Sequence, residues 1–414
     1  MARTAWDLVW ILLWQDRGAD ALAVAEQAER VVPDEATRER ARVLAIVGAC
    51  CGWLGDYATF LQRSTEAHVI AQRLADQHPL GQVLALQTNM YWNFLKVRQT
   101  VDAGRDGVEA SRAAGDVWDL ASTLTIQGFG LGFSGAPEEA RRAADEAEQL
   151  AVRVGYDGAA ANAGAVRTMA TAMLSGELGA VERSARSIVD IFGRAGPWSF
   201  SGLILISMSR FWKGAWDEAD RNPDEALALE PPEVWREWAR GWRFVLQAYR
   251  GNRTWLDQYR HRHDLLFREG RTPFGDDAWF VIEAVEALAG LGERGEAHRL
   301  YSAILALMLM RDGFIANIGG PSEMCAGLTA SAGAQWDSAE LHFDTALRQA
   351  HDFPSKIGQP EVRRWYAWML LDRDAPGDRD KARTFLGEAI ELYQAIGMPK
   401  HVEIAERMLE APRS

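Results

Sequence analysis

The chain contains few of the residues that form covalent or metal cross-links. Only three of its 414 residues are cysteine, Cys50, Cys51 and Cys325, and they form neither a CxxC pair nor a metal-ligand spacing. An odd number of thiols fits a reducing compartment. His261 and His263 are two positions apart and point to different sides of a helix, so one ion cannot easily take both. We expect no metal site and no cofactor.

The chain also lacks a long uninterrupted apolar run. The N-terminal apolar stretch follows Arg3, is interrupted by Asp7, and ends at Gln15 and Asp16. A helix that crosses a bilayer needs about 20 apolar residues, and no cleavage-like segment follows this stretch. The sequence therefore predicts neither a signal peptide nor a membrane span, and it favours a cytoplasmic location.

Basic charge is scarce relative to acidic charge. The 45 Lys and Arg residues are outnumbered by 58 Asp and Glu, which gives a formal net charge of −13. Proteins that bind nucleic acid usually present a basic stripe and gain affinity from counterion release, and no such stripe is present. The composition therefore argues against nucleic acid and anionic membranes as partners.

What the sequence does contain is a helical repeat. Proline is limited to 14 residues, whereas hydrophobic residues make up 48% of the chain, so many uninterrupted helices can form. Ala339, Phe343, Ala346, Leu347 and Ala350 occupy offsets 0, 4, 7, 8 and 11, which mark one face of an α-helix. Similar segments begin at positions 21, 60, 103, 140, 181, 219, about 256, 297, 339 and 382.

These starting positions are evenly spaced. They cover 361 residues in nine intervals, which is about 40 residues per unit. A break such as LGDY (54–57) or SGAP (134–137) precedes each segment, and another apolar helix precedes the break. Each unit is therefore predicted to be helix A, a tight turn and helix B. Stacked units of this kind form an all-α solenoid, which we expect to be right-handed and to contain about ten units.

One unit conflicts with the pattern. Pro223 falls at offset 4 of the sixth helix B, where a helix interior does not tolerate proline. The helix either restarts near 222–223 or the stack is kinked there. We therefore expect a first block of units over residues 1–221, a second over 222–399, a bend near 222–233, and a capping helix with a tail over 400–414.

The small–aromatic–small spacing of helix B, followed by proline, resembles the tetratricopeptide repeat (TPR), although the period exceeds the usual 34 residues. The last unit, residues 363–399, is similar to the C-terminal helical tail of bacterial class III adenylate/guanylate cyclases and of large LuxR-type and AfsR-like regulators. This resemblance implies a bacterial signalling protein. No catalytic or nucleotide-binding residue carries over, because the chain contains no GxxxxGK[ST] loop and no cyclase aspartate pair.

No catalytic motif is present elsewhere. The run QGFGLGFSG (127–135) superficially suggests a phosphate loop, but it lacks the preceding strand that such a loop requires. Close helix packing is the better interpretation of its glycines. No Ser, Cys or His has the neighbours that nucleophilic catalysis needs, so we expect no enzyme activity and name no catalytic residue.

Helix A residues of such superhelices line the concave surface, and this is where we expect a partner to bind. The 17 tryptophans are mostly predicted to pack between repeats. Polar residues that share one face of a helix A are the candidate ligand-binding or partner-binding residues, with the arginines suited to a carboxylate-bearing peptide or a small anion. They are Asn89, Trp92, Asn93, Lys96, Arg210, Arg236, Arg240, Arg243 and Arg364.

The sequence thus favours a non-catalytic interaction or regulatory scaffold that binds a protein or peptide partner in its concave groove. The alternative is a second class of function, a small-molecule sensor in which the ligand changes the pitch of the superhelix. An enzyme with a site hidden in the groove is the third.

Overall fold

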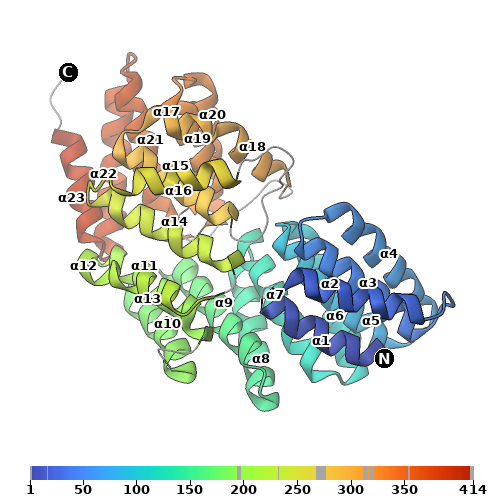
Figure 1. The fold of residues 1–414 in the computed structure, drawn as a ribbon. Helices are drawn as coiled ribbons and strands as arrows, with labels where there is room; N and C mark the ends of the chain where they lie inside the picture. The colour runs from blue at the N-terminus through green and yellow to red at the C-terminus, as the bar shows by residue number, and fades with distance from the viewer. Residues whose placement is uncertain are drawn as a thin grey trace.

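The structure is a computed structural model that describes residues 2–15, 17–193, 197–231, 233–266, 277–310, 316–317, 320–352 and 355–410. Figure 1 shows that helices dominate these residues and stack along the chain. The only strands among them are β1 (Ala316–Asn317) and β2 (Gly320–Pro321), which form one short antiparallel pair. The predicted all-α solenoid is therefore confirmed.

The first five units are regular pairs of helices A and B. Helix B packs on its own helix A and on helix A of the next unit, and successive A helices also contact one another. The pairs are α1 (Ala2–Trp14) with α2 (Gly18–Val31), α3 (Arg38–Trp53) with α4 (Tyr57–Arg73), α5 (Gln77–Asn93) with α6 (Val97–Ala114), α7 (Val117–Ser134) with α8 (Pro137–Val154), and α9 (Asp157–Ser175) with α10 (Leu178–Phe192).

The second five units are less regular. In the seventh, α14 packs mainly on α16 and only slightly on α15. Their elements are η1 (Pro197–Ser199), α11 (Phe200–Trp212), α12 (Trp216–Ala219) and α13 (Arg221–Ala228); α14 (Glu233–Tyr249) and α15 (Trp255–Leu266); α16 (Asp277–Leu291), α17 (Arg294–Arg299) and α18 (Tyr301–Met310); α19 (Ser322–Ala332) and α20 (Trp336–Asp352); α21 (Gly358–Arg373) and α22 (Asp378–Ile396); and the closing helix α23 (Pro399–Glu410).

The small residues predicted near the start of helix B are buried at the junctions between helices. Their methyl groups let helix B approach its neighbours closely. Five that have no exposed surface are Ala21, Ala140, Ala297, Ala339 and Ala382. The larger residue at offset 4 fills the adjacent groove, as when Phe343 stacks on Tyr366 of the next unit at a centroid distance of 5.1 Å. The repeat pattern therefore corresponds to the packing seams.

The predicted breaks are tight turns. Gly55 has a φ of +91°, a left-handed conformation that glycine adopts without strain. Its neighbour Asp56 caps α4, because its carboxylate accepts a hydrogen bond of 3.0 Å from the backbone N–H of Thr59. One glycine and one aspartate therefore end helix A and begin helix B.

Helix B of the sixth unit restarts at the proline, one of the two outcomes that the sequence allowed. The helix breaks between α12 and α13, which places Pro223 in the first turn of α13. Proline has no N–H to donate to the carbonyl of Ala219, four residues earlier. The hydroxyl of Ser207 donates to that carbonyl instead, at 2.7 Å. Helix B of the eighth unit is broken too, at Leu300 between α17 and α18, where no proline predicts it.

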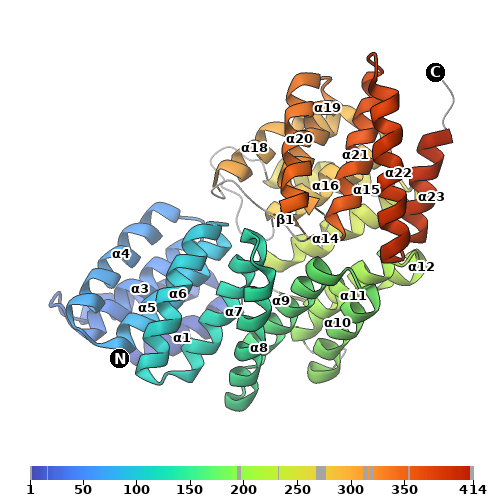
Figure 2. The ribbon, with the colours of Figure 1, turned by 180° about the vertical axis from the view of Figure 1, so that it is seen from behind.

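The C-terminal units return to the middle of the array. The backbone N–H of Lys356 donates to the carbonyl of Met173 in α9, at 3.0 Å. The ring of His401 in α23 lies 5.1 Å from that of Phe211 in α11, and Figures 1 and 2 show α23 beside α12 and near α11. The array is therefore closed by contacts between its middle and its end.

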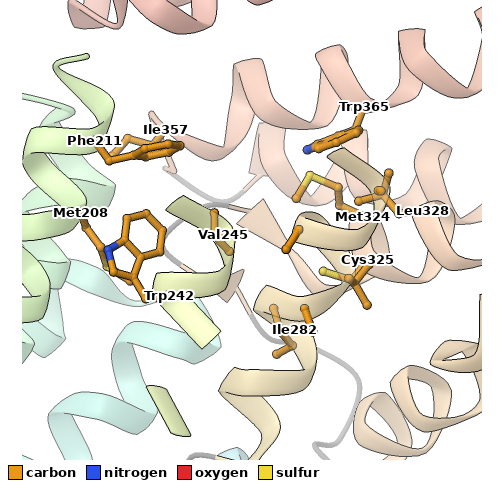
Figure 3. Packing of buried hydrophobic residues seen from close by; sticks show 14 of the residues in the cluster. Met208, Phe211, Trp242, Val245, Ile282, Met324, Cys325, Leu328, Ile357 and Trp365 are labelled. Carbon is orange, nitrogen blue, oxygen red and sulfur yellow. The ribbon is translucent and has the colours of Figure 1, made fainter. Parts of the chain in front are cut away.

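The core between these parts is apolar. Figure 3 shows Phe211 and Trp242 on one side, Val245 and Ile282 in the middle, and Trp365 with α19 residues on the other. Buried hydrophobic side chains from Leu95 to Ala405 form one continuous cluster. This cluster crosses the predicted boundary at 221–222; the two blocks, the bend at 222–233 and the separate cap remain predictions.

Within the described ranges, no helix combines the length and the apolar character that crossing a bilayer requires.

Candidate functional site

The A helices enclose a cavity on the concave side. It contains about 1150 Å³ of empty space, including the part that is open to solvent. Its lining comes from α1, α3, α5, α7, α9, η1, α11, α14 and α16, so eight units contribute. Seven of the 17 tryptophans line it: Trp10, Trp53, Trp92, Trp198, Trp235, Trp238 and Trp279.

Aromatic rings form two connected groups in this cavity. In the first, Trp92 stacks on Phe129 at 5.1 Å and lies 5.4 Å from Phe133, whose ring is 5.0 Å from Trp279. This group joins α5, α7 and α16. Aromatic pairs of this kind contribute stabilisation beyond that of the apolar area they bury. This part of the cavity wall therefore forms without a ligand.

The second group lies on η1, α11 and α14. Trp198 is 6.0 Å from Trp235, and Phe200 is 6.5 Å from Trp235 and 6.2 Å from Trp238 in an edge-to-face arrangement. The cavity therefore has aromatic side chains from the first unit to the eighth.

Besides the indole N–H groups of the tryptophans, the polar side chains of the lining are three carboxamides and one hydroxyl, that of Ser201. The Nδ2 of Asn93 donates to the Oδ1 of Asn89 at 3.0 Å, which leaves the Oδ1 of Asn93 and the Nδ2 of Asn89 for other partners. The Asn162 side chain, two units away on α9, makes no hydrogen bond with any described residue. None of the twenty described lining residues is ionisable.

Three of the predicted site residues belong to this cavity: Asn89, Trp92 and Asn93. Their helix offsets place them on the concave face of α5, as expected. Lys96 does not line it; this residue precedes α6, and its Nζ lies over the ring of Tyr57 at 5.7 Å.

The predicted arginines do not line the cavity, which differs from the expectation of an anion-binding groove. Each is bonded to another group of the array instead. Arg210 donates to Glu182 and Asn222, at 3.3 and 3.2 Å. Arg236 donates to the carbonyl of Pro231 at 2.8 Å.

The other three arginines are paired with carboxylates. Arg240 pairs with Glu237, and Arg243 pairs with Asp224 and lies over the ring of Trp255. Arg364 is 3% exposed and donates to Glu361 at 2.5 Å. A guanidinium that already has a carboxylate partner has little to offer an anionic ligand, so the arginines stabilise the array. Their binding role stays a prediction.

Arg364 is the centre of a buried polar cluster, defined here as Tyr249, Glu286, Glu361, Arg364, Tyr393 and His401. Arg364 donates to the hydroxyls of Tyr249 at 2.6 Å and Tyr393 at 3.1 Å. Those hydroxyls donate in turn to Glu286 at 2.5 Å and Glu361 at 2.6 Å. The cluster joins α14 and α16 to α21, α22 and α23.

Burial dominates the ionisation of this cluster. It raises the pKa of Glu286 to about 7, and the carboxylate of Glu361 adds to that effect. Burial also opposes ionisation of Glu361, yet Arg364 holds the pKa of Glu361 below its ordinary value. Burial lowers the pKa of His401 to about 4. One carboxylate is therefore paired with the guanidinium, and the second is more easily protonated.

The glycines of residues 127–135 pack against neighbouring helices, which confirms the packing interpretation. A Cβ on Gly128 would lie 3.1 Å from Val166, and one on Gly130 would lie 3.1 Å from Thr100. Among the described residues, no group of three or more His, Cys, Asp or Glu could hold a metal ion.

Sequence reasoning missed Asn162, Trp235 and Trp238, and it assigned most tryptophans to packing alone. Asn162, Trp235 and Trp238 each lie on a helix A, and Trp198 lies immediately before one. Their position on or next to a helix A is the signal that could have found them. What the sequence did not show is which face of each helix A points inward.

Comparisons with known proteins show similarity in fold. No family model matches the chain, and no curated protein matches it. Among solved structures, a Rap protein complexed with competence and sporulation factor covers 95% of this chain and 98% of its own at 9% identity, with a TM-score of 0.52. Yeast Tom70 covers 99% and 96% at 13% identity, with a TM-score of 0.35. The chain is a TPR-like helical-repeat solenoid.

Proposed function

We propose that this solenoid is a non-catalytic binding protein that holds a peptide segment of a partner in its concave cavity. The observation that carries the proposal is the cavity itself, with A-helix side chains from eight units around one space and carboxamides at two places along it. A carboxamide can donate to a peptide C=O and accept from a peptide N–H, and aromatic rings hold apolar side chains. The complex of the Rap protein with its factor is consistent with this use of the fold.

The size of the site supports a short segment. Asn89 and Asn93 lie on α5 and Asn162 on α9, with α7 between them. Packed helices are about 8–10 Å apart, so the two places are separated by roughly 16–20 Å. An extended chain advances about 3.3–3.6 Å per residue, and a segment of about five or six residues covers this distance.

A phage-displayed random hexapeptide library tests the proposal. We expect peptides to be enriched on the wild-type chain and lost on the Asn93→Ala, Asn162→Ala double variant. Gln394→Ala, a carboxamide exposed on α22, is the matched control and should retain them. Equal enrichment on the wild-type chain and the double variant, or none on either, would contradict the proposal.

A small aromatic molecule is the second candidate ligand. The observation that favours it is the largely apolar lining, in which ten of the twenty described residues are Trp or Phe, because small-molecule sites are mostly apolar with a few polar groups. A compound retained through purification, visible by native mass spectrometry and absent from the Trp92→Ala variant, would support this ligand over a peptide.

We further propose that the binding event is regulatory, and that the array is a cytoplasmic part of a bacterial signalling protein. This proposal rests on the resemblance that the sequence of residues 363–399 suggests to cyclase and regulator tails, and the three free cysteines fit the location. A ligand that changes the pitch of the superhelix, measured by small-angle X-ray scattering, is the expected behaviour. An unchanged scattering curve at saturation would contradict it.

A further inference from the structure

The described residues that line the concave cavity are unusual because none of them is charged. A quarter of all residues in the chain are charged, so twenty residues taken without regard to position would include about five. The twenty described lining residues include none. Because the A helices carry ionisable residues elsewhere, the absence is specific to the face that points inward.

Two charged residues that lie close in sequence to lining residues have partners outside the cavity. On α14, Glu237 lies between Trp235 and Trp238, yet it is 1% exposed and accepts from Arg262 at 2.7 Å. On the α5 side, Lys96 follows Asn93 by three residues and lies over Tyr57. Neither offers a counter-charge to a molecule inside the cavity.

We infer that the cavity selects an uncharged segment: a stretch of about five or six residues with large apolar or aromatic side chains, taken from within a partner chain so that its termini and ionised side chains stay outside. This inference rests on the proposed peptide-binding function and adds the chemical class of the ligand.

The physical reason is the cost of an unpaired charge. An ionised carboxylate or ammonium that loses water without gaining a partner is destabilised by several kcal/mol, whereas one buried apolar side chain contributes roughly 1.5–3 kcal/mol. One charge inside the cavity therefore cancels the gain from one or two aromatic contacts. The three carboxamides satisfy peptide groups without adding charge.

The same reasoning argues against a free short peptide with ionised termini as the ligand. Its ammonium and carboxylate lie within a few residues of every side chain, so at least one terminus enters a cavity that spans five or six residues. An internal segment, or a peptide capped at both ends, avoids this cost.

Three synthetic hexapeptide mixtures test the inference, each acetylated at the N-terminus and amidated at the C-terminus. The first is randomised over uncharged residues, and the second and third carry Asp or Lys at the third position. Each is incubated with the full chain, bound peptides are separated by gel filtration, and their amounts are measured by mass spectrometry.

We expect at least tenfold more peptide to be retained from the uncharged mixture than from either charged mixture. Asn162→Ala should reduce this retention, and Trp118→Ala, an exposed ring that stacks on Tyr156 outside the cavity, should not. Retention of the Asp or Lys mixture equal to or above that of the uncharged one would overturn the charge selection while leaving peptide binding in place. No retention from any mixture would overturn both.

Discussion

At the scale of single residues, the buried polar cluster explains how the C-terminal helices are held to the middle of the array. Arg364 is surrounded by two carboxylates and two tyrosine hydroxyls from α14, α16, α21 and α22. Removing one member of a buried ion pair leaves the other charged and unpaired, which costs about 3–5 kcal/mol.

The first prediction concerns this arginine. Arg364→Met should lower the free energy of unfolding by about 3–5 kcal/mol in urea titrations, because Glu361 loses its guanidinium. Its neighbour Arg363 pairs with Glu388 at the surface, so Arg363→Met is the control and should cost less than about 1 kcal/mol. Equal effects of the two variants would contradict the structural role of the cluster.

The second prediction concerns the pH dependence that Glu286 gives to stability. Its pKa is raised from 4.5 to about 7 in the folded chain, so the folded state binds a proton that the unfolded state has released. Stability from this group is therefore present below pH 4.5 and is lost as the pH rises through 7. Glu286→Gln should be more stable than the wild type at pH 8, by up to roughly 3 kcal/mol.

This advantage should vanish near pH 4.5, as measured by thermal unfolding at each pH. Glu391→Gln, exposed on α22, is the control. His401 acts in the opposite sense, because its pKa is lowered to about 4 and its contribution is lost as the pH falls below 6.5. Comparing each variant with the wild type at the same pH removes the His401 contribution. A constant difference between Glu286→Gln and wild type would contradict the assignment.

At the scale of elements, the close approach of α14 and α16 departs most from the repeat. A Cβ on Gly241 would lie 2.9 Å from the Cα of Phe280, so only glycine fits between the two backbones. This contact positions Trp238 and Trp279, which line the cavity from the two helices.

Gly241→Ala should therefore destabilise the chain by about 1–3 kcal/mol and weaken ligand binding. In contrast, Gly387 in α22 has open space around it, and Gly387→Ala should stabilise the chain by about 0.5–1 kcal/mol because alanine favours helix. Denaturant unfolding measures both. A neutral Gly241→Ala would show that the helices can separate without cost.

The elements also show what the sequence could predict. The helix B starts were predictable because small residues recur at offsets 0 and 7 on a buried face, and Pro223 marked the broken helix. The break at Leu300 was not predictable, since no residue there disfavours helix. Asn89, Trp92 and Asn93 could be grouped from the sequence because they share one face of α5, and their binding role stays a prediction. The pairings of Arg210 with Glu182 and of Arg243 with Asp224 could not be predicted, because these carboxylates lie on other helices.

At the scale of the whole molecule, the array is closed by α23. Its residues His401 and Ala405 are buried against α22 and the middle units. Deleting residues 399–414 should expose Phe211, Tyr249 and Tyr393 and lower the free energy of unfolding by at least about 2 kcal/mol. Deletion of 411–414 alone is the control. An unchanged melting temperature after the longer deletion would contradict the closing role.

The central claim is that the tryptophan-lined concave cavity holds an uncharged segment of a partner. Tryptophan emission, excited at 295 nm while an uncharged hexapeptide selected from the capped mixture is added, tests it most directly, because seven of the 17 tryptophans line the cavity. We expect a saturable blue shift as the peptide displaces water from these indoles, and its loss in the Asn93→Ala, Asn162→Ala double variant. Peptide binding that leaves the emission of the wild-type chain unchanged would contradict the claim.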